Sequence, residues 1–150
     1  MEDGEVVGSN WYKGCAYDSV HKSLEDFPDE CIGFVYKVRN SITGKVYIGK
    51  KILRTKRTRK PLKGYKRKRV DYVESNWKTY KGSSDITKAW DMADCFRSIL
   101  FLCTRKDEMT YYETMAIIEE GFGSDKLVNS NILGKFYKKT VQEKFGKLVY

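Results

Sequence analysis

Histidine is scarce in this chain of 150 residues, and the placement of the cysteines argues against a common class of metal site. There is one histidine, His21, and none of the four cysteines forms a Cys-x-x-Cys pair. A structural zinc site needs about four such ligands at short spacings. The sequence therefore argues against one, and we expect the cysteines to be buried, reduced thiols.

Long apolar runs are also lacking. No stretch is long enough to cross a bilayer, and the first residues show no signal-peptide pattern. We therefore expect a soluble, cytoplasmic protein with no membrane partner. The length fits one domain with a hydrophobic core of its own.

Acidic residues are absent from residues 50–69, although this segment holds 12 of the 29 basic residues. The rest of the chain has 17 basic and 20 acidic residues, so the net charge of +9 has a local origin. Because Pro61 and Gly64 interrupt the segment, we predict a loop rather than one long helix. Such a basic loop is typical of proteins that bind a phosphate backbone. The alternative is a solvated loop, or a localisation signal at residues 66–69.

Alternating apolar and polar residues predict a β-hairpin with strands at residues 32–39 and 45–52. The segment between them is rich in turn-forming residues. An antiparallel pairing across this turn would bring Tyr36 and Tyr47 close together on one face. Two neighbouring phenol groups can orient a water molecule, so this hairpin is the first candidate for a functional site.

The remaining pattern predicts a helix at 85–93, an apolar strand at 96–103 and a helix at 107–120. With the hairpin, these elements form a small α+β domain, a three-stranded antiparallel β-sheet flanked by helices. The organisation that we expect is an N-terminal arm at 1–30, a domain at 31–135 that contains the basic loop 50–69, and a C-terminal tail or short helix at 136–150.

The hairpin resembles the signature of the GIY-YIG nuclease superfamily, here in the form Phe34-Val35-Tyr36 and Tyr47-Ile48-Gly49. The spacing of the two triplets fits, although Phe-Val precedes the first tyrosine. The resemblance extends from about Cys31 to about Ile132. It implies the GIY-YIG fold and an endonuclease that hydrolyses phosphodiester bonds in DNA, with Mg²⁺ or Mn²⁺ as its cofactor.

Glu113 in the predicted helix 107–120 is the candidate metal ligand. Helical periodicity places Met109, Ala116 and Ile117 on its side of the helix. A carboxylate in an apolar stripe needs a compensating charge, and a hard cation such as Mg²⁺ prefers oxygen ligands. The resemblance implies the same role. The alternative is a glutamate at the rim, paired with a cation of the basic loop.

Further catalytic roles follow from the resemblance. Tyr36 and Tyr47 would position or deprotonate the attacking water, and an arginine would clamp the scissile phosphate. Arg57 is the first choice for that arginine because of its spacing from Tyr47, and Arg54 is the second. The usual element there is a helix, whereas this chain has a basic stretch with a proline.

An asparagine after the glutamate helix would order the site. Asn131 fits this position better than Asn129, and simple loop capping is the alternative. Contacts to DNA are expected from basic and hydroxyl-bearing residues of the hairpin, the basic loop and the segment after it, namely Lys50, Lys51, Lys63, Lys66, Arg67, Lys68, Arg69, Tyr80 and Lys81.

The resemblance implies a nicking or site-specific nuclease of a phage or mobile element, acting in a bacterial or phage-infected cell. A homo-oligomer or a second encounter would be needed for a double-strand break. One alternative is a non-catalytic nucleic-acid-binding protein that uses the basic loop. It would have no need of a carboxylate that repels phosphate, so we favour the enzyme. An RNA nuclease or a restriction enzyme would share the site.

Overall fold

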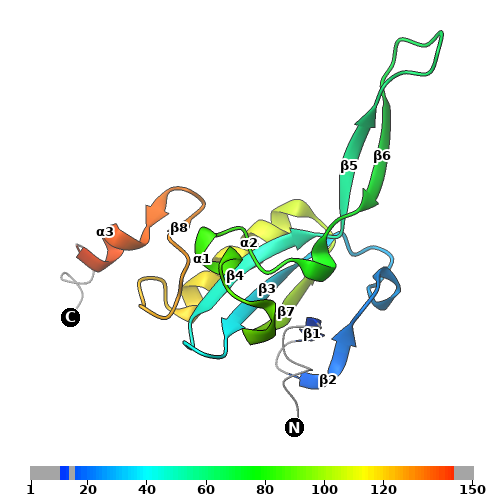
Figure 1. Cartoon of the computed structure of the whole chain (residues 1–150). Helices are drawn as coiled ribbons and strands as arrows, with labels where there is room; N and C mark the ends of the chain where they lie inside the picture. Colours follow the sequence, from blue (N-terminus) through cyan, green and yellow to red (C-terminus); the bar gives the residue numbers. More distant parts are fainter. Residues whose placement is uncertain (1–10, 14–15, 144–150) are drawn as a thin grey trace.

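A five-stranded sheet forms the centre of the computed structural model, which describes residues 11–13 and 16–143 (Figure 1). Its strands, in spatial order, are β2 (Ala16–His21), β1 (Trp11–Lys13), β7 (Cys95–Cys103), β3 (Gly33–Asn40) and β4 (Val46–Ile52). Strands β7, β3 and β4 are antiparallel, while β1 runs parallel to β7. The predicted three-stranded antiparallel sheet is confirmed, and the N-terminal residues extend it by two strands.

The predicted β3–β4 hairpin is confirmed to within one residue at each strand end. Residues of β3 alternate between two hydrophobic cores, one on each face of the sheet. Phe34, Tyr36 and Val38 enter the first core, whereas Val35 enters the second. Helix α2 (Lys106–Glu120) covers the second core and ends at Gly121, which adopts a left-handed conformation with φ 100°.

The first core is covered by an irregular segment with little helix. It contains the 3₁₀ turns η2 (Trp77–Thr79) and η3 (Met92–Asp94), with the four-residue helix α1 (Asp85–Lys88) between them. The predicted helix at 85–93 is therefore wrong in its second half. Asp91 has an extended backbone with ψ 131°, and its side chain accepts a hydrogen bond from the Ala93 N–H. This cap starts a new turn instead of continuing the helix.

A two-stranded ribbon projects from the body (Figure 1), built from β5 (Arg54–Arg59) and β6 (Arg69–Glu74). We call residues 54–74 the arm, which is distinct from the N-terminal arm predicted at residues 1–30. The predicted loop at 50–69 is therefore wrong over β5, and residues 50–52 belong to β4. Pro61 and Gly64 lie in the turn between β5 and β6, as their turn-forming chemistry favours.

The chain after α2 runs along the outer edge of β4. The Val46 N–H donates to the Lys126 carbonyl and the Val128 N–H donates to the Val46 carbonyl, both at 2.8 Å. Three short elements follow, namely β8 (Asn131–Ile132), β9 (Phe136–Tyr137) and α3 (Lys138–Glu143).

The cysteine and membrane expectations can be compared with the structure. Cys31, Cys95 and Cys103 are buried and free, as predicted, whereas Cys15 lies outside the described residues. None of the helices in the described part of the chain has the length and apolarity to cross a bilayer.

Candidate nuclease site

A cleft of about 720 Å³ opens beside the outer edge of β4. Because β4 is the last strand of the sheet, residues from both faces can reach this edge. Tyr47 and Lys50 of β4 line the cleft together with residues 83–86, the middle of α2 and residues 128–133. Segments far apart in the sequence thus meet beside the outer edge of β4.

Tyr36 and Tyr47 lie side by side as predicted, with ring centroids 6.3 Å apart. Only Tyr47 lines the cleft, where its hydroxyl lies 3.0 Å from Ser83 Oγ. Tyr36 is 1% exposed and packs against the ring of Trp11. Burial raises the pKa of Tyr47, and it raises the pKa of Tyr36 further. Both phenols are therefore neutral at physiological pH.

Two glycines allow this arrangement. Tyr36 pairs with Gly49 across the hairpin, and a Cβ at Gly49 would lie 2.4 Å from the Tyr36 hydroxyl oxygen. Gly82 has φ +127°, and a Cβ there would lie 2.5 Å from Thr87 Oγ1. This backbone lets residues 82–84 turn closely past Tyr47. The glycine of the second signature triplet thus provides the space for the first tyrosine.

Glu113 projects from α2 into the same cleft and is half-buried. Within the described residues its carboxylate makes no hydrogen bond or ion pair. Burial raises its pKa above the ordinary value of 4.5, and the nearby Lys50 ammonium partly opposes this shift. The Lys50 Nζ donates to Thr110 Oγ1 at 2.7 Å, one helical turn before Glu113.

This carboxylate fits a hard cation that keeps most of its waters. No group of three or more His, Cys, Asp or Glu side chains forms a closed metal cage among the residues described. Asp85, at the start of α1, is the other carboxylate that lines the cleft. Mg²⁺ commonly binds through one or two carboxylates and substrate phosphates, so an unpartnered glutamate in an open cleft meets its requirements.

The predicted arginines are not brought to this cleft. Arg57 and Arg54 both lie on the exposed strand β5 of the arm. Arg54 lines a different cavity at the base of the arm, together with Lys56 and Lys106. Of the described residues that line the cleft, Lys50 is the one with a positive charge.

Both asparagines line the cleft, but they make different contacts. Asn129 is buried, and its side chain pairs with the backbone of Ile48. It accepts a hydrogen bond from the Ile48 N–H at 2.9 Å and donates one to the Ile48 carbonyl at 2.7 Å. Asn131 accepts from the Gly134 N–H at 2.9 Å and so caps a local turn. The contact that orders the tyrosine hairpin is therefore made by Asn129.

A family model described as "Putative endonuclease segE, GIY-YIG domain" matches residues 17–141 of the chain. The chain belongs to this family. The match includes the tyrosine hairpin, the arm, α2 and both asparagines, and it confirms the GIY-YIG resemblance read from the hairpin. Comparisons with curated proteins and with solved structures gave no match.

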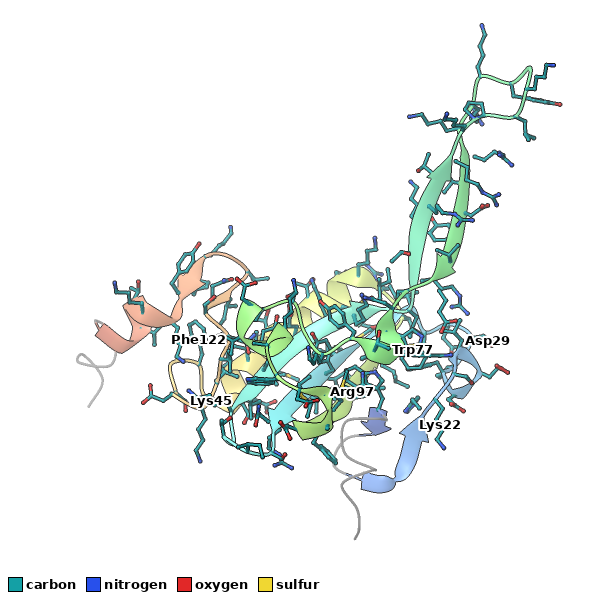
Figure 2. All side chains as sticks on the ribbon, viewed as in Figure 1. Lys22, Asp29, Lys45, Trp77, Arg97 and Phe122 are labelled. Carbon is teal, nitrogen blue, oxygen red and sulfur yellow. The ribbon has the colours of Figure 1, made fainter. Side chains whose placement is uncertain are left out.

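A third tyrosine approaches the pair in this GIY-YIG domain. The Tyr80 ring lies edge-on to Tyr36 at 6.0 Å, and the Lys51 ammonium lies 4.0 Å from the Tyr80 ring centroid. Arg97, labelled in Figure 2, is fully buried and donates to the carbonyls of Lys78 and Tyr80 at 2.9 Å each. Burial lowers the Arg97 pKa to about 10. Arg97 thus fixes the backbone that carries Tyr80.

The remaining residues predicted to contact DNA are found in two places. The Lys81 Nζ donates to the Lys88 carbonyl at 2.9 Å, so this side chain caps α1. The others lie at the end of the arm, exposed to solvent, and are Lys63, Lys66, Arg67, Lys68 and Arg69.

Sequence reasoning missed two residues of the site. Ser83 was not among the predicted site residues, because it lies 36 positions after Tyr47 and nothing in the sequence indicates their contact. Asn129 was ranked below Asn131 because an isoleucine follows the latter. The apolar residues Leu127 and Val128, which continue a strand-like pairing toward Asn129, were the available signal.

Replacing Asn129 with alanine is expected to destabilise the GIY-YIG domain by about 2–6 kcal/mol. The change leaves two buried backbone groups of Ile48 unpaired, at about 1–3 kcal/mol each. Thermal or urea unfolding measures the effect. Asn131→Ala is the matched control, because its hydrogen bonds are exposed and should contribute far less. Equal destabilisation by the two variants would contradict this assignment.

Proposed function

We propose that this chain is a metal-dependent endonuclease that hydrolyses phosphodiester bonds in DNA, with Mg²⁺ or Mn²⁺ held by Glu113. The observation that supports it best is the convergence of Tyr47, Lys50 and Glu113 on one cleft. A hydroxyl, a cation and an unpartnered carboxylate are the groups that metal-assisted phosphodiester hydrolysis requires. A module that only binds nucleic acid has no need of a half-buried carboxylate that repels phosphate.

Each side chain of the cleft has a distinct task in this proposal. A divalent metal bound by Glu113 supplies charge neutralisation at the phosphate and at the leaving oxygen. Tyr47, held by Ser83, orients the attacking water through its hydroxyl. The pKa of Tyr47 is raised in the free protein. For Tyr47 itself to accept a proton from the water, nearby positive charge would therefore have to lower this pKa. Tyr36 lies too deep to meet substrate and positions Tyr47.

Lys50 takes the place that the sequence prediction gave to an arginine. Thr110 holds its ammonium at the entrance to the cleft, beside Glu113. There it can contact the scissile phosphate as a point charge, although without the bidentate geometry of a guanidinium. Arg57 and Arg54 contact DNA away from the reacting phosphate.

The described part of each chain has one cleft of this composition, so each productive encounter would cut one strand. The primary product is then a nicked duplex, and a double-strand break requires a second copy or a second encounter. A nicking or site-specific enzyme of phage or mobile-element origin fits this behaviour.

Cleavage of a supercoiled plasmid tests the proposed function directly. With Mg²⁺ we expect nicked circles to appear before linear DNA, and with EDTA we expect no product. Mn²⁺ added in excess over EDTA should restore cleavage. Undiminished cleavage in EDTA would contradict the metal dependence. Tight binding to several duplexes without cleavage in either metal would instead favour the binding module.

A further inference from the structure

The arm has the shape of an isolated antiparallel ribbon. Six register pairs join β5 to β6, from Arg54 opposite Glu74 to Arg59 opposite Arg69. Every residue of β5 is exposed, and side chains extend from both faces of the ribbon (Figure 2). A two-stranded ribbon has no core of its own, so an exposed ribbon of this kind needs another reason to be present.

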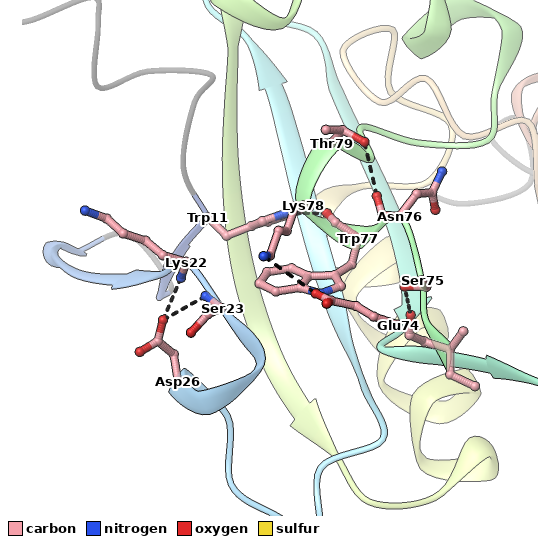
Figure 3. A network of polar contacts seen from close by, with 11 residues as sticks. Trp11, Lys22, Ser23, Asp26, Glu74, Ser75, Asn76, Trp77, Lys78 and Thr79 are labelled. Atoms are coloured by element: carbon pink, nitrogen blue, oxygen red, sulfur yellow. Dashed lines mark hydrogen bonds and ion pairs between the residues drawn. The ribbon is translucent and has the colours of Figure 1, made fainter. Parts of the chain in front are cut away.

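The root of the arm is fastened to the protein core. The Ser75 hydroxyl donates to the Ile52 carbonyl at 2.6 Å, and the Ser75 N–H donates to the Leu53 carbonyl at 2.8 Å. Glu74 accepts from the indole of buried Trp77 at 2.8 Å, and the Trp77 carbonyl accepts from Trp11 Nε1 at 2.8 Å (Figure 3). These contacts fix the direction in which the arm leaves the body.

The two faces of the ribbon differ in chemistry. On one face, which we call the arginine face, Thr55, Arg57 and Arg59 lie opposite Val73, Asp71 and Arg69. The other face is partly turned toward the body, because Arg54, Lys56 and Tyr72 line a cavity with Asp29 and Lys106. The arginine face is absent from that cavity and is open to a partner.

We propose that the arm inserts into the major groove of duplex DNA beside the cleavage site, with the arginine face against the base edges. Its partner is a nucleic acid because residues 54–74 carry ten basic and two acidic residues. The major groove of B-form DNA, about 12 Å wide, admits a two-stranded ribbon. The major groove of A-form RNA is too deep and narrow for side chains to read. The arm thus selects duplex DNA, the substrate class of the function proposed above.

Asp71 is the feature that points to base reading rather than phosphate contact alone. It forms an ion pair with Arg59 and lies directly opposite Arg57 on the same face. A carboxylate on a surface that only met phosphates would weaken binding. Here it fixes the Arg59 guanidinium, while Arg57, which makes no hydrogen bond or ion pair with the described residues, can contact guanine O6 and N7 in bidentate fashion. The lysines in the turn at 60–68 contact the backbone.

Groove-specific competitors test the insertion of the arm. Binding of the full chain to a duplex is measured without divalent metal, so the readout does not depend on cleavage. Methyl green, which occupies the major groove, should displace the protein, whereas the minor-groove ligand distamycin should not. RNA of the same sequence should bind at least about tenfold more weakly. Displacement by distamycin alone, or equal affinity for RNA, would overturn the proposal.

Two variants, one that keeps the positive charge and one that removes it, test the base reading. Preferred duplexes are first selected from a random pool by the wild-type chain. Arg57→Lys keeps the charge but loses the fork, and should lower the preference for the selected duplex by about 5- to 150-fold. Lys66→Ala in the turn should weaken binding to all duplexes equally and lower the salt slope by about one. Equivalent behaviour of the two variants, or a pool without enriched sequences, would overturn base reading.

The experiments distinguish the role of the arm in DNA binding from the proposed nuclease activity. Sequence-specific groove binding without any plasmid cleavage would retain the role of the arm and reject the nuclease. Metal-dependent cleavage that is insensitive to methyl green and to Arg57→Lys would retain the nuclease and reject the arm as a reader. Both variants lie on exposed positions and should melt as the wild type does.

Discussion

Replacing Glu113 with glutamine is expected to lower the rate of DNA cleavage by at least about a thousandfold while leaving metal-free DNA binding unchanged. The substitution keeps the shape of the side chain and removes the charge that holds the metal. A metal ion contributes several kcal/mol to stabilising the transition state, which corresponds to this loss. Plasmid nicking and binding in EDTA measure the two quantities separately.

Glu119→Gln is the matched control for this experiment. Glu119 lies on the same helix but is exposed and does not line the cleft. Its replacement should leave the cleavage rate within about twofold of wild type. Equal losses in the two variants would indicate a general effect on α2, and full activity of Glu113→Gln would reject Glu113 as the ligand.

Glu113→Gln should also change the stability of the protein. It is expected to lower the cleavage rate but to raise the melting temperature. The pKa of Glu113 in the fold lies above its ordinary value of 4.5, so ionisation is less favourable in the folded than in the unfolded chain. The metal-free protein therefore loses stability as the pH rises through this range. Glu113→Gln should melt at a higher temperature than wild type at pH 7 without metal, and the difference should shrink at pH 4.

The second large effect is expected at the tyrosine that lines the cleft. Tyr47→Phe should lower kcat by about 10²–10³, because a positioned proton donor or acceptor contributes on this scale. KM should change little, since the ring remains in place. Single-turnover cleavage with bound DNA measures the chemical step.

Tyr36→Phe provides the comparison that makes this result specific. Tyr36 is buried and does not line the cleft, so the loss of its hydroxyl should cost at most about tenfold. Ser83→Ala, which removes the contact to the Tyr47 hydroxyl, should give an intermediate loss. A greater loss in Tyr36→Phe than in Tyr47→Phe would reverse the two roles.

The parts of the fold that could be predicted are those whose side chains are sorted by burial. Phe34, Tyr36 and Val38 alternate with residues of the opposite face, and this pattern indicated the hairpin. Helix α2 was predicted to within one residue at its start, and its predicted end at Glu120 is correct because Gly121 follows in a left-handed conformation. Burial on one side leaves a periodic trace in the sequence.

The arm left no such trace. Its strand β5 is exposed on both faces, so the run of arginine, lysine and threonine has no apolar periodicity. The chain leaves the main sheet at Leu53, which is buried and whose carbonyl accepts from Ser75. This departure from the sheet carries Arg57 away from the cleft, and it explains why counting from Tyr47 did not find the cation there. A spacing rule holds only while the intervening backbone keeps the same course.

The parallel pairing of β1 with β7 has a consequence for the synthesis of the protein. Trp11 leaves the ribosome well before its sheet partner Arg97, and Glu113 and Asn129 follow later still. Chains fold as their contacting segments emerge, and such distant pairings form last. A nascent chain therefore cannot assemble the cleft before residue 129 is available. A translation intermediate that lacks Asn129 therefore has no complete cleft, so any activity of the cleft has to wait until this residue has been added.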